Sequence, residues 1–177
     1  MPFSQVMKIG KEVCIGLAAA HAKGLIHRDI NPSNLWLEKP HGRVKILDFG
    51  LARSNADTVE IAKVGEILGT PPFMAPEQAY GNPLDFHTDL FSLGCVLYWL
   101  TTGVLPFQAK DDFSTLVALS KDKSPSPKSI CKDLPEEFSD LVLWLLEKVP
   151  TERPESAMAV FDKLSEIETR MANESKG

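Results

Sequence analysis

The stretch 27-HRDINPSN-34 is the part of the sequence that constrains the fold most strongly. It places charged and amide side chains between two apolar runs, 24-GLI-26 and 35-LWL-37. Polar groups next to a core are costly to bury unless they find hydrogen-bond partners or bind a ligand. We therefore expect residues 27–34 to have a function and the neighbouring segments to hold them in place.

The segments on either side of this stretch have contrasting patterns. Upstream, apolar residues recur at helical spacing over residues 2–23, and Gly24 suits the position just after a helix. Downstream, a turn containing proline and glycine separates the short apolar runs Leu35–Leu37 and Val44–Leu47, which predicts a β-hairpin. Residues 48–77 show no periodicity, and so long a loop in a compact domain is usually functional.

The C-terminal half is predicted to be helical. The uncharged stretch Leu90–Ala109 is long enough to span a bilayer, but Gly103 and Pro106 interrupt it. A buried helix that ends near Thr102 is the better interpretation, and no membrane span is expected. The other predicted segments are helices at 111–120, 136–148 and 156–170, a polar loop at 121–131 and a frayed tail at 171–177. The predicted fold class is mainly α (α+β), a helical bundle with one small β-hairpin.

Charge and cysteine content limit the kind of partner. Residues 1–53 carry eight Lys or Arg against four Asp or Glu, whereas residues 54–177 carry eleven against twenty. The acidic balance argues against a nucleic-acid-binding protein, although an anionic ligand could bind the basic part. The chain has three widely spaced cysteines and no CxxC pair. This pattern predicts reduced thiols in a cytoplasmic protein rather than disulfides or a zinc site.

Three side chains that could supply oxygen ligands to a metal ion are expected to lie close together. Asn34 begins the first strand of the hairpin and Asp48 follows the second, so the hairpin brings both close to Asp29. Oxygen-only ligands suit a hard cation such as Mg²⁺, which also binds through phosphates and water. Asp29 could instead remain free to accept a proton from a hydroxyl. Taken singly, such residues are more often turn formers or helix caps.

Ordered motifs make the chain resemble the C-terminal lobe of a protein kinase, nearest to the bacterial serine/threonine kinases of the Hanks type. Residues 27–34 match the catalytic loop, and 48-DFG-50 and 75-APE-77 match the two ends of the activation segment. Residues 69–79 and 89–107 resemble the stretch that closes this segment and the central buried helix. The resemblance implies a kinase-like C-terminal lobe over residues 1–170.

The resemblance also implies roles for individual residues around ATP and Mg²⁺. Asp29 would orient the substrate hydroxyl and accept its proton, and Thr70 would brace Asp29. Asn34 and Asp48 would hold Mg²⁺ on the phosphates of ATP. Trp36 would lie beneath the adenine, where it could stack or crowd the pocket; the alternative is a bulky core residue under the hairpin.

Further residues would have regulatory or structural roles by the same resemblance. Arg28 would contact a phosphorylated residue of the activation segment. Thr58 is a better candidate for that residue than Thr70, because Thr70 would contact Asp29. His27 and Phe49 would stack in a spine of apolar contacts, and Gly50 completes the DFG motif. The remaining structural residues are Asp89, which would hold the backbone of the catalytic loop, and Glu77 and Arg153, which would form a buried ion pair.

The chain departs from the family pattern in two main ways. The family's serine/threonine members have lysine two residues after the catalytic aspartate, where this chain has the uncharged Asn31. The sequence also contains no Gly-rich loop and no strand lysine of the kind an N-terminal lobe supplies. We therefore expect a fragment without its N-terminal lobe, the alternative being a genuine lone C-terminal lobe, and the exposed face of the hairpin would be covered by the missing lobe or by a partner.

Three functions are compatible with this pattern. The first is the catalytic lobe of a serine/threonine kinase that transfers phosphate from ATP to protein hydroxyls. The alternative is a pseudokinase or regulatory protein-binding module, which Asn31 and the missing lobe favour. A small-molecule phosphotransferase shares part of the catalytic loop, but Arg28 and the DFG and APE motifs argue against it.

Overall fold

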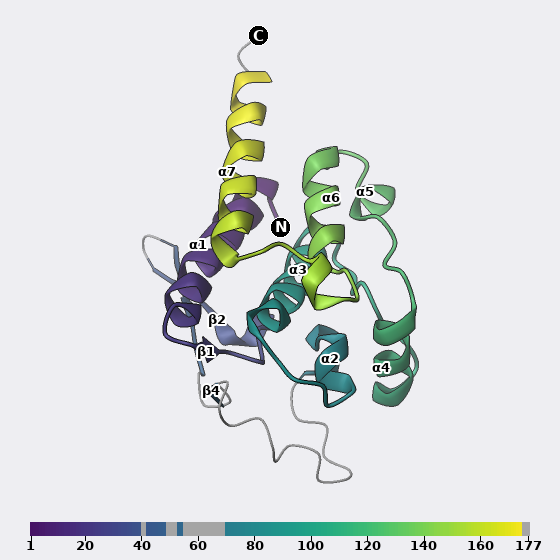
Figure 1. The fold of residues 1–177 in the computed structure, drawn as a ribbon. Helices are drawn as coiled ribbons and strands as arrows, with labels where there is room; N and C mark the ends of the chain where they lie inside the picture. Colours follow the sequence, from purple (N-terminus) through teal and green to yellow (C-terminus); the bar gives the residue numbers. More distant parts are fainter. Residues whose placement is uncertain (40–41, 49–52, 55–69, 175–177) are drawn as a thin grey trace.

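The computed structural model describes residues 1–39, 42–48, 53–54 and 70–174, most of them helical (Figure 1). The helices are α1 (Phe3–His21), α2 (Pro76–Ala79), α3 (Phe86–Thr102), α4 (Asp112–Lys121), α5 (Pro127–Ile130), α6 (Glu136–Leu145) and α7 (Ala157–Glu174). The strands are β1 (Leu25–Ile26), β2 (Leu35–Glu38), β3 (Arg43–Ile46) and β4 (Arg53–Ser54). Single 3₁₀ turns are η1 (Pro32–Asn34), η4 (Pro71–Phe73) and η5 (Pro150–Glu152). The predicted fold class, mainly α with one small hairpin, is confirmed.

Helix α3 forms the centre of the core. Its first turn is capped by Asp85, whose carboxylate accepts a hydrogen bond from the backbone N–H of His87 at 2.9 Å. Eleven consecutive residues, Thr88–Tyr98, are buried. The helix ends at Gly103, which has φ of 77°, a conformation that glycine adopts without strain. The uncharged stretch is thus a buried helix ending at Thr102, and no described helix is long and apolar enough to cross a membrane.

Helix α1 leads directly into the 27–34 stretch and packs against α3 and α7. Its apolar stripe is buried, and Gly24, with φ of 71°, follows the helix as predicted. At Gly16 the helix approaches the hairpin closely, because an added Cβ would lie 2.8 Å from Cδ1 of Ile46. This contact fixes the hairpin against the helix that precedes the 27–34 stretch.

The predicted hairpin is confirmed, and its two faces differ. The strands β2 and β3 pair antiparallel, with Leu35 opposite Ile46 and Trp36 opposite Lys45. Residues that pair across two strands share a face, so Leu35 and Ile46 lie on one face, and both are partly buried. Neighbours along a strand point to opposite faces. Trp36 lies on the other face and is 60% exposed, so its interpretation as a core residue is wrong. It remains open to a ligand or to another segment.

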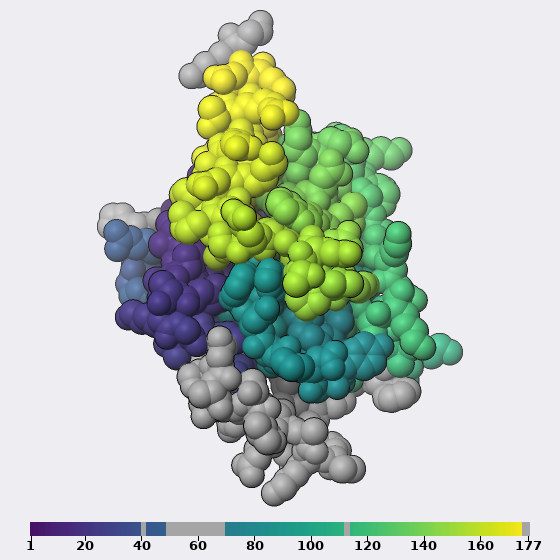
Figure 2. Space-filling view, in the orientation of Figure 1, coloured from purple at the N-terminus to yellow at the C-terminus, as the bar shows by residue number. Residues whose placement is uncertain are grey.

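Three details differ from the sequence prediction. A two-residue pairing of β1 with β4 was not expected. The loop predicted at 121–131 contains the turn of helix α5, which begins at Pro127, a residue pre-set for a first helical turn. The frayed tail is wrong for residues 171–174, because α7 continues to Glu174 and Met171 packs against the core. Figure 2 shows this end of α7 rising beyond the rest of the molecule.

Candidate functional site

Residues 27–34, which the resemblance predicts to be the catalytic loop, are held by a carboxylate of the central helix. The fully buried Asp89 accepts hydrogen bonds from the backbone N–H groups of His27 and Arg28, at 2.9 and 2.8 Å. The ring Nε2 of His21, in the last turn of α1, lies 2.8 Å from the same carboxylate. The structure therefore places Asp89 where the family pattern predicts it, and adds His21, which sequence reasoning missed.

Asp29 is fixed through both of its carboxylate oxygens. The side-chain amide of Asn34 donates to Oδ2 at 2.9 Å and also to the backbone carbonyl of Asp29 at 2.8 Å. The hydroxyl of Thr70 donates to Oδ1 at 3.2 Å. Each oxygen of a carboxylate can accept two hydrogen bonds, so Asp29 retains the capacity to accept a proton. The structure brings these three predicted residues together.

Asn31 is turned into the loop, with 4% of its surface exposed. Its Oδ1 accepts from the N–H of Ser33 at 2.9 Å and so caps η1. Its amide donates to the carbonyl of Asp29 and to the hydroxyl of Thr70, both at 3.2 Å. Asn31 thus links the catalytic loop to Thr70 but brings no positive charge to the site.

Asp48 lies beside the loop at the end of β3. The preceding residue, Leu47, connects the two segments: its N–H donates to the carbonyl of Asn34, and its carbonyl lies 2.8 Å from Nε2 of His27. Asp48 is exposed and has φ of 57°, an unusual conformation for a residue with a side chain. Residues held in such backbone conformations cluster at active sites, which is consistent with the predicted role of Asp48.

The donor set fits Mg²⁺ on a phosphate ligand. Asn34 uses its amide N–H₂ toward Asp29, which leaves its Oδ1 as an oxygen ligand, and Asp48 supplies an exposed carboxylate. Within the ranges that the structure describes, no three His, Cys, Asp or Glu side chains gather as a metal site. Mg²⁺ is commonly held by one or two carboxylates together with phosphates and water, so a small set of protein oxygen ligands is compatible with it.

The remaining predicted site residues divide into two groups. Arg28 and His27 are buried in the catalytic loop, with 6% and 0% of their surface exposed. Phe49, Gly50 and Thr58 lie outside the described residues, so their predicted roles stay predictions.

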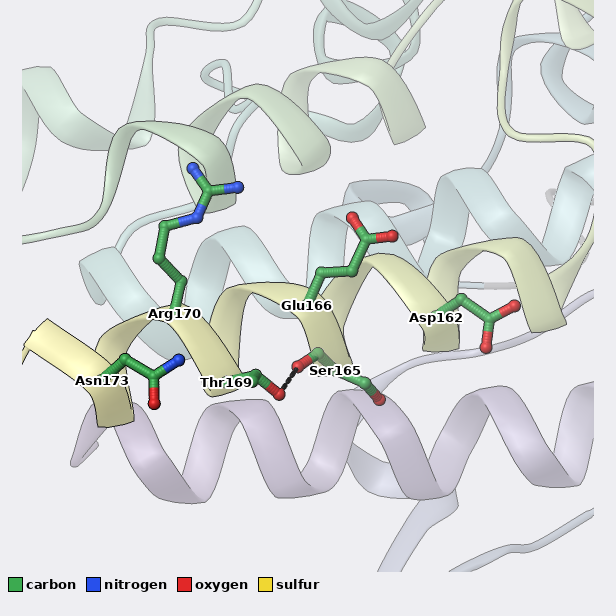
Figure 3. A pocket seen from close by; sticks show the side chains of 6 residues that line it. All are labelled: Asp162, Ser165, Glu166, Thr169, Arg170 and Asn173. Atoms are coloured by element: carbon green, nitrogen blue, oxygen red, sulfur yellow. Dashed lines mark hydrogen bonds between the residues drawn. The ribbon is translucent and has the colours of Figure 1, made fainter.

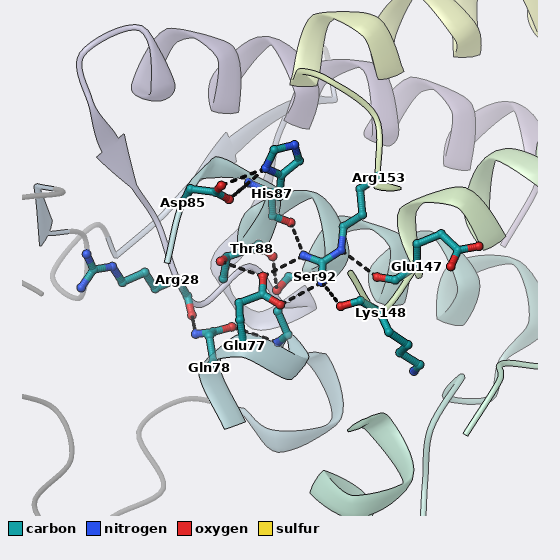
Figure 4. A network of polar contacts seen from close by, with 11 residues as sticks. Arg28, Glu77, Gln78, Asp85, His87, Thr88, Ser92, Glu147, Lys148 and Arg153 are labelled. Carbon is teal, nitrogen blue, oxygen red and sulfur yellow. Dashed lines mark hydrogen bonds and ion pairs between the residues drawn. The ribbon is translucent and has the colours of Figure 1, made fainter. Parts of the chain in front are cut away.

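Glu77 and Arg153 form the expected buried ion pair (Figure 4). The guanidinium donates to both carboxylate oxygens, at 2.7 and 2.8 Å, and Thr88 donates to the same carboxylate at 3.0 Å. The guanidinium also donates to the backbone carbonyls of Glu147, His87 and Lys148. The pair therefore joins α2 to α3 and to the segment after α6.

Removing Arg153 should unfold much of this region. We expect Arg153→Ala to lower the free energy of unfolding by about 3–5 kcal/mol, because Glu77 would be left buried without its counter-charge.

Several of the shifted pKa values belong to buried packing residues. Burial raises the pKa of the Cys14 thiol to about 12 and raises that of Cys95 as well. Burial lowers the pKa of Lys148 to about 8, where its ammonium lies 3.6 Å from the ring centroid of Phe107. Cysteines act as nucleophiles in the thiolate form, so neither buried thiol is a candidate catalytic group. The three cysteines are free, as predicted.

A surface hollow along α7 is separate from this site (Figure 3). Its lining residues are Asp162, Ser165, Glu166, Thr169, Arg170 and Asn173. The hydroxyl of Thr169 donates to the carbonyl of Ser165 at 2.8 Å, and Arg170 pairs with Glu137. Because all six residues come from one helix and none from the catalytic loop, we assign this hollow no function.

The helical body with its small hairpin has the fold expected of a kinase-like C-terminal lobe. The family model "Protein kinase domain" matches residues 1–164, and the chain therefore belongs to the protein kinase family. The predicted resemblance to bacterial serine/threonine kinases is confirmed.

Curated relatives support membership of the protein kinase family. A probable serine/threonine-protein kinase of Clostridium perfringens is 37% identical over 94% of this chain and 24% of its own length. Serine/threonine-protein kinase Pkn1 of Myxococcus xanthus is 38% identical over 90% of this chain and 23% of its own length. Tyrosine-protein kinase MasK of the same species is 36% identical over 93% of this chain and 26% of its own length. The chain spans about a quarter of the length of these relatives.

Proposed function

We propose that this chain forms the catalytic lobe of a protein kinase that transfers the terminal phosphate of Mg-ATP to serine or threonine hydroxyls of proteins. The observation that carries the proposal is the anchored carboxylate of Asp29, held by Asn34 on one oxygen and by Thr70 on the other. A general base must be oriented before its substrate hydroxyl arrives, and this arrangement orients it. A cytoplasmic setting fits the three free thiols.

Each site residue then has a chemical task. Asp29 orients the attacking hydroxyl and takes its proton as the bond to phosphorus forms. Asn34 and Asp48 would hold Mg²⁺, which supplies positive charge to the phosphate oxygens when bound. Trp36 offers an exposed indole on the outer face of the hairpin, where an adenine ring could stack. An N-terminal lobe of the kind found in the family would complete the nucleotide site.

Phosphoryl transfer from Mg-ATP is the direct test. The full-length gene product that carries this chain should label serine and threonine of an unstructured acceptor protein, and chelation of Mg²⁺ should abolish the label. Labelled tyrosine instead would contradict the proposed hydroxyl class. Labelling of a small alcohol but of no protein would favour a small-molecule phosphotransferase.

Asn31 favours a second candidate, a pseudokinase that binds proteins without transferring phosphate. Stabilising negative charge on the transferring phosphate is usually the largest catalytic contribution, and Asn31 has no charge to contribute. The two candidates differ in how they should respond to a restored cation.

We expect Asn31→Lys to raise the rate of phosphoryl transfer by about a hundredfold, since a positioned cation or donor is typically worth that much. The lysine would replace an amide that already lies 3.2 Å from the Thr70 hydroxyl, beside Asp29. Asn82→Lys adds the same charge at an exposed position and should change nothing. An unchanged rate in Asn31→Lys, with ATP still bound, would favour the pseudokinase.

A further inference from the structure

The backbone at Arg28 adopts a conformation that needs support from its surroundings. Its φ of 70° lies in the left-handed region, which residues with a side chain seldom occupy. Asp89 holds this turn from one side by accepting the N–H groups of His27 and Arg28. A left-handed residue persists where neighbouring contacts fix it from more than one direction.

The second contact comes from Gln78, in helix α2. Its side-chain Nε2 donates to the backbone carbonyl of Arg28 at 2.8 Å, while its Oε1 accepts from the N–H of Ala75 at 3.0 Å. Figure 4 shows Gln78 reaching the main chain of Arg28, whose side chain points in the opposite direction. One amide thus connects the end of the activation segment to the catalytic loop.

The contact acts on the peptide that joins Arg28 to Asp29. The carbonyl of Arg28 and the N–H of Asp29 belong to one planar unit, so fixing either group fixes both. Gln78 holds the carbonyl, and Nδ1 of His27 lies 3.3 Å from the N–H of Asp29. This peptide is therefore held at both ends, directly before the carboxylate that Asn34 and Thr70 anchor.

We propose that Gln78 is a positioning residue that sets the orientation of Asp29 through the Arg28–Asp29 peptide. This inference rests on the proposed function, because it assigns a task toward the catalytic carboxylate. Gln78 joins helix α2 to the loop that carries Asp29. A shift of α2 would rotate the peptide and with it the carboxylate of Asp29.

The alternative is that Gln78 merely caps the short helix α2 through its bond to Ala75. Two variants separate these roles. Gln78→Glu keeps an acceptor for the Ala75 N–H but places a carboxylate oxygen against the Arg28 carbonyl, where a donor is needed. Gln78→Met keeps the length of the side chain and loses both bonds. If capping were the whole role, only Gln78→Met would be impaired.

The test uses the full-length gene product and two independent measurements. We expect both variants to lower kcat about tenfold, with KM for ATP unchanged, as for the loss of one hydrogen bond to a buried group. Amide hydrogen exchange at Arg28 and Asp29 should accelerate by a similar factor. Gln108→Glu makes the same chemical change at an exposed position and should leave kcat and exchange unaffected.

The exchange measurement keeps the two proposals apart. If the Gln78 variants exchange faster at Arg28 and Asp29 but the native protein transfers no phosphate, Gln78 does position the Arg28–Asp29 peptide and the proposed function is overturned. Unchanged exchange and an unchanged kcat in Gln78→Glu would overturn the positioning role of Gln78 and leave the proposed function standing.

Discussion

Arg153→Ala is expected to lower the free energy of unfolding by about 3–5 kcal/mol, because removing one partner of a buried pair leaves an uncompensated charge. Among the residues that the structure describes, Glu77 would keep only the Thr88 hydroxyl as a donor to its carboxylate. The guanidinium also satisfies three backbone carbonyls and lies 4.9 Å from the ring centroid of Phe91. Each lost contact lowers the free energy of unfolding further, so the total loss would be a large fraction of the stability of a typical domain.

The chain contains a matched control on its surface. Arg170 pairs with Glu137, and their side chains are 55% and 39% exposed. Arg170→Ala removes the same kind of side chain from the same kind of pair, and should cost about 1 kcal/mol or less. Urea unfolding of the two variants, followed by far-UV circular dichroism, measures the difference. Equal losses in both would show that burial of the Glu77–Arg153 pair contributes nothing special.

The long elements could be predicted from the sequence because each carries its own signals. Apolar spacing gave α1, and the uncharged run gave α3, with Gly24 and Gly103 marking where the helices end. The hairpin followed from two short apolar runs around a turn. These are local patterns, so they survive without knowledge of the neighbouring elements.

Short elements could not be predicted because the contacts that stabilise them are distant in sequence. The β1–β4 pairing joins Leu25–Ile26 to Arg53–Ser54, and two-residue strands have no periodicity to detect. The extension of α7 past Arg170 depends on Met171 packing against the core. Tertiary packing overrides weak local preference in both cases.

The site divides in the same way. Motif spacing identified Asp29, Asn34 and Thr70, whose side chains meet one another. His21 was missed because it contacts Asp89, a carboxylate already assigned to holding the backbone of residues 27–34. Gln78 was missed because it donates to a backbone carbonyl, that of Arg28. A partner that is a backbone carbonyl leaves no trace in the pattern of side chains, so only coordinates could reveal it.

Asp29→Asn is expected to lower phosphoryl transfer by about 10²–10⁴-fold, the range typical of losing a general base. Asparagine has nearly the same shape, and its oxygen can still accept from Asn34. Its amide N–H₂ can donate a hydrogen bond to the Thr70 hydroxyl, which replaces the hydrogen bond that Thr70 now donates to Asp29. The variant should therefore fold normally and bind Mg-ATP with unchanged affinity.

That separation of binding from transfer is what distinguishes the two candidate functions. Calorimetric titration of the full-length variant with Mg-ATP measures binding, and labelled ATP with an acceptor protein measures transfer. Asp140→Asn makes the same chemical change at an exposed position on α6 and should affect neither. A kinase loses transfer and keeps binding when Asp29 becomes asparagine. A pseudokinase has no transfer to lose, so any residual signal would be equal in the native protein and in both variants.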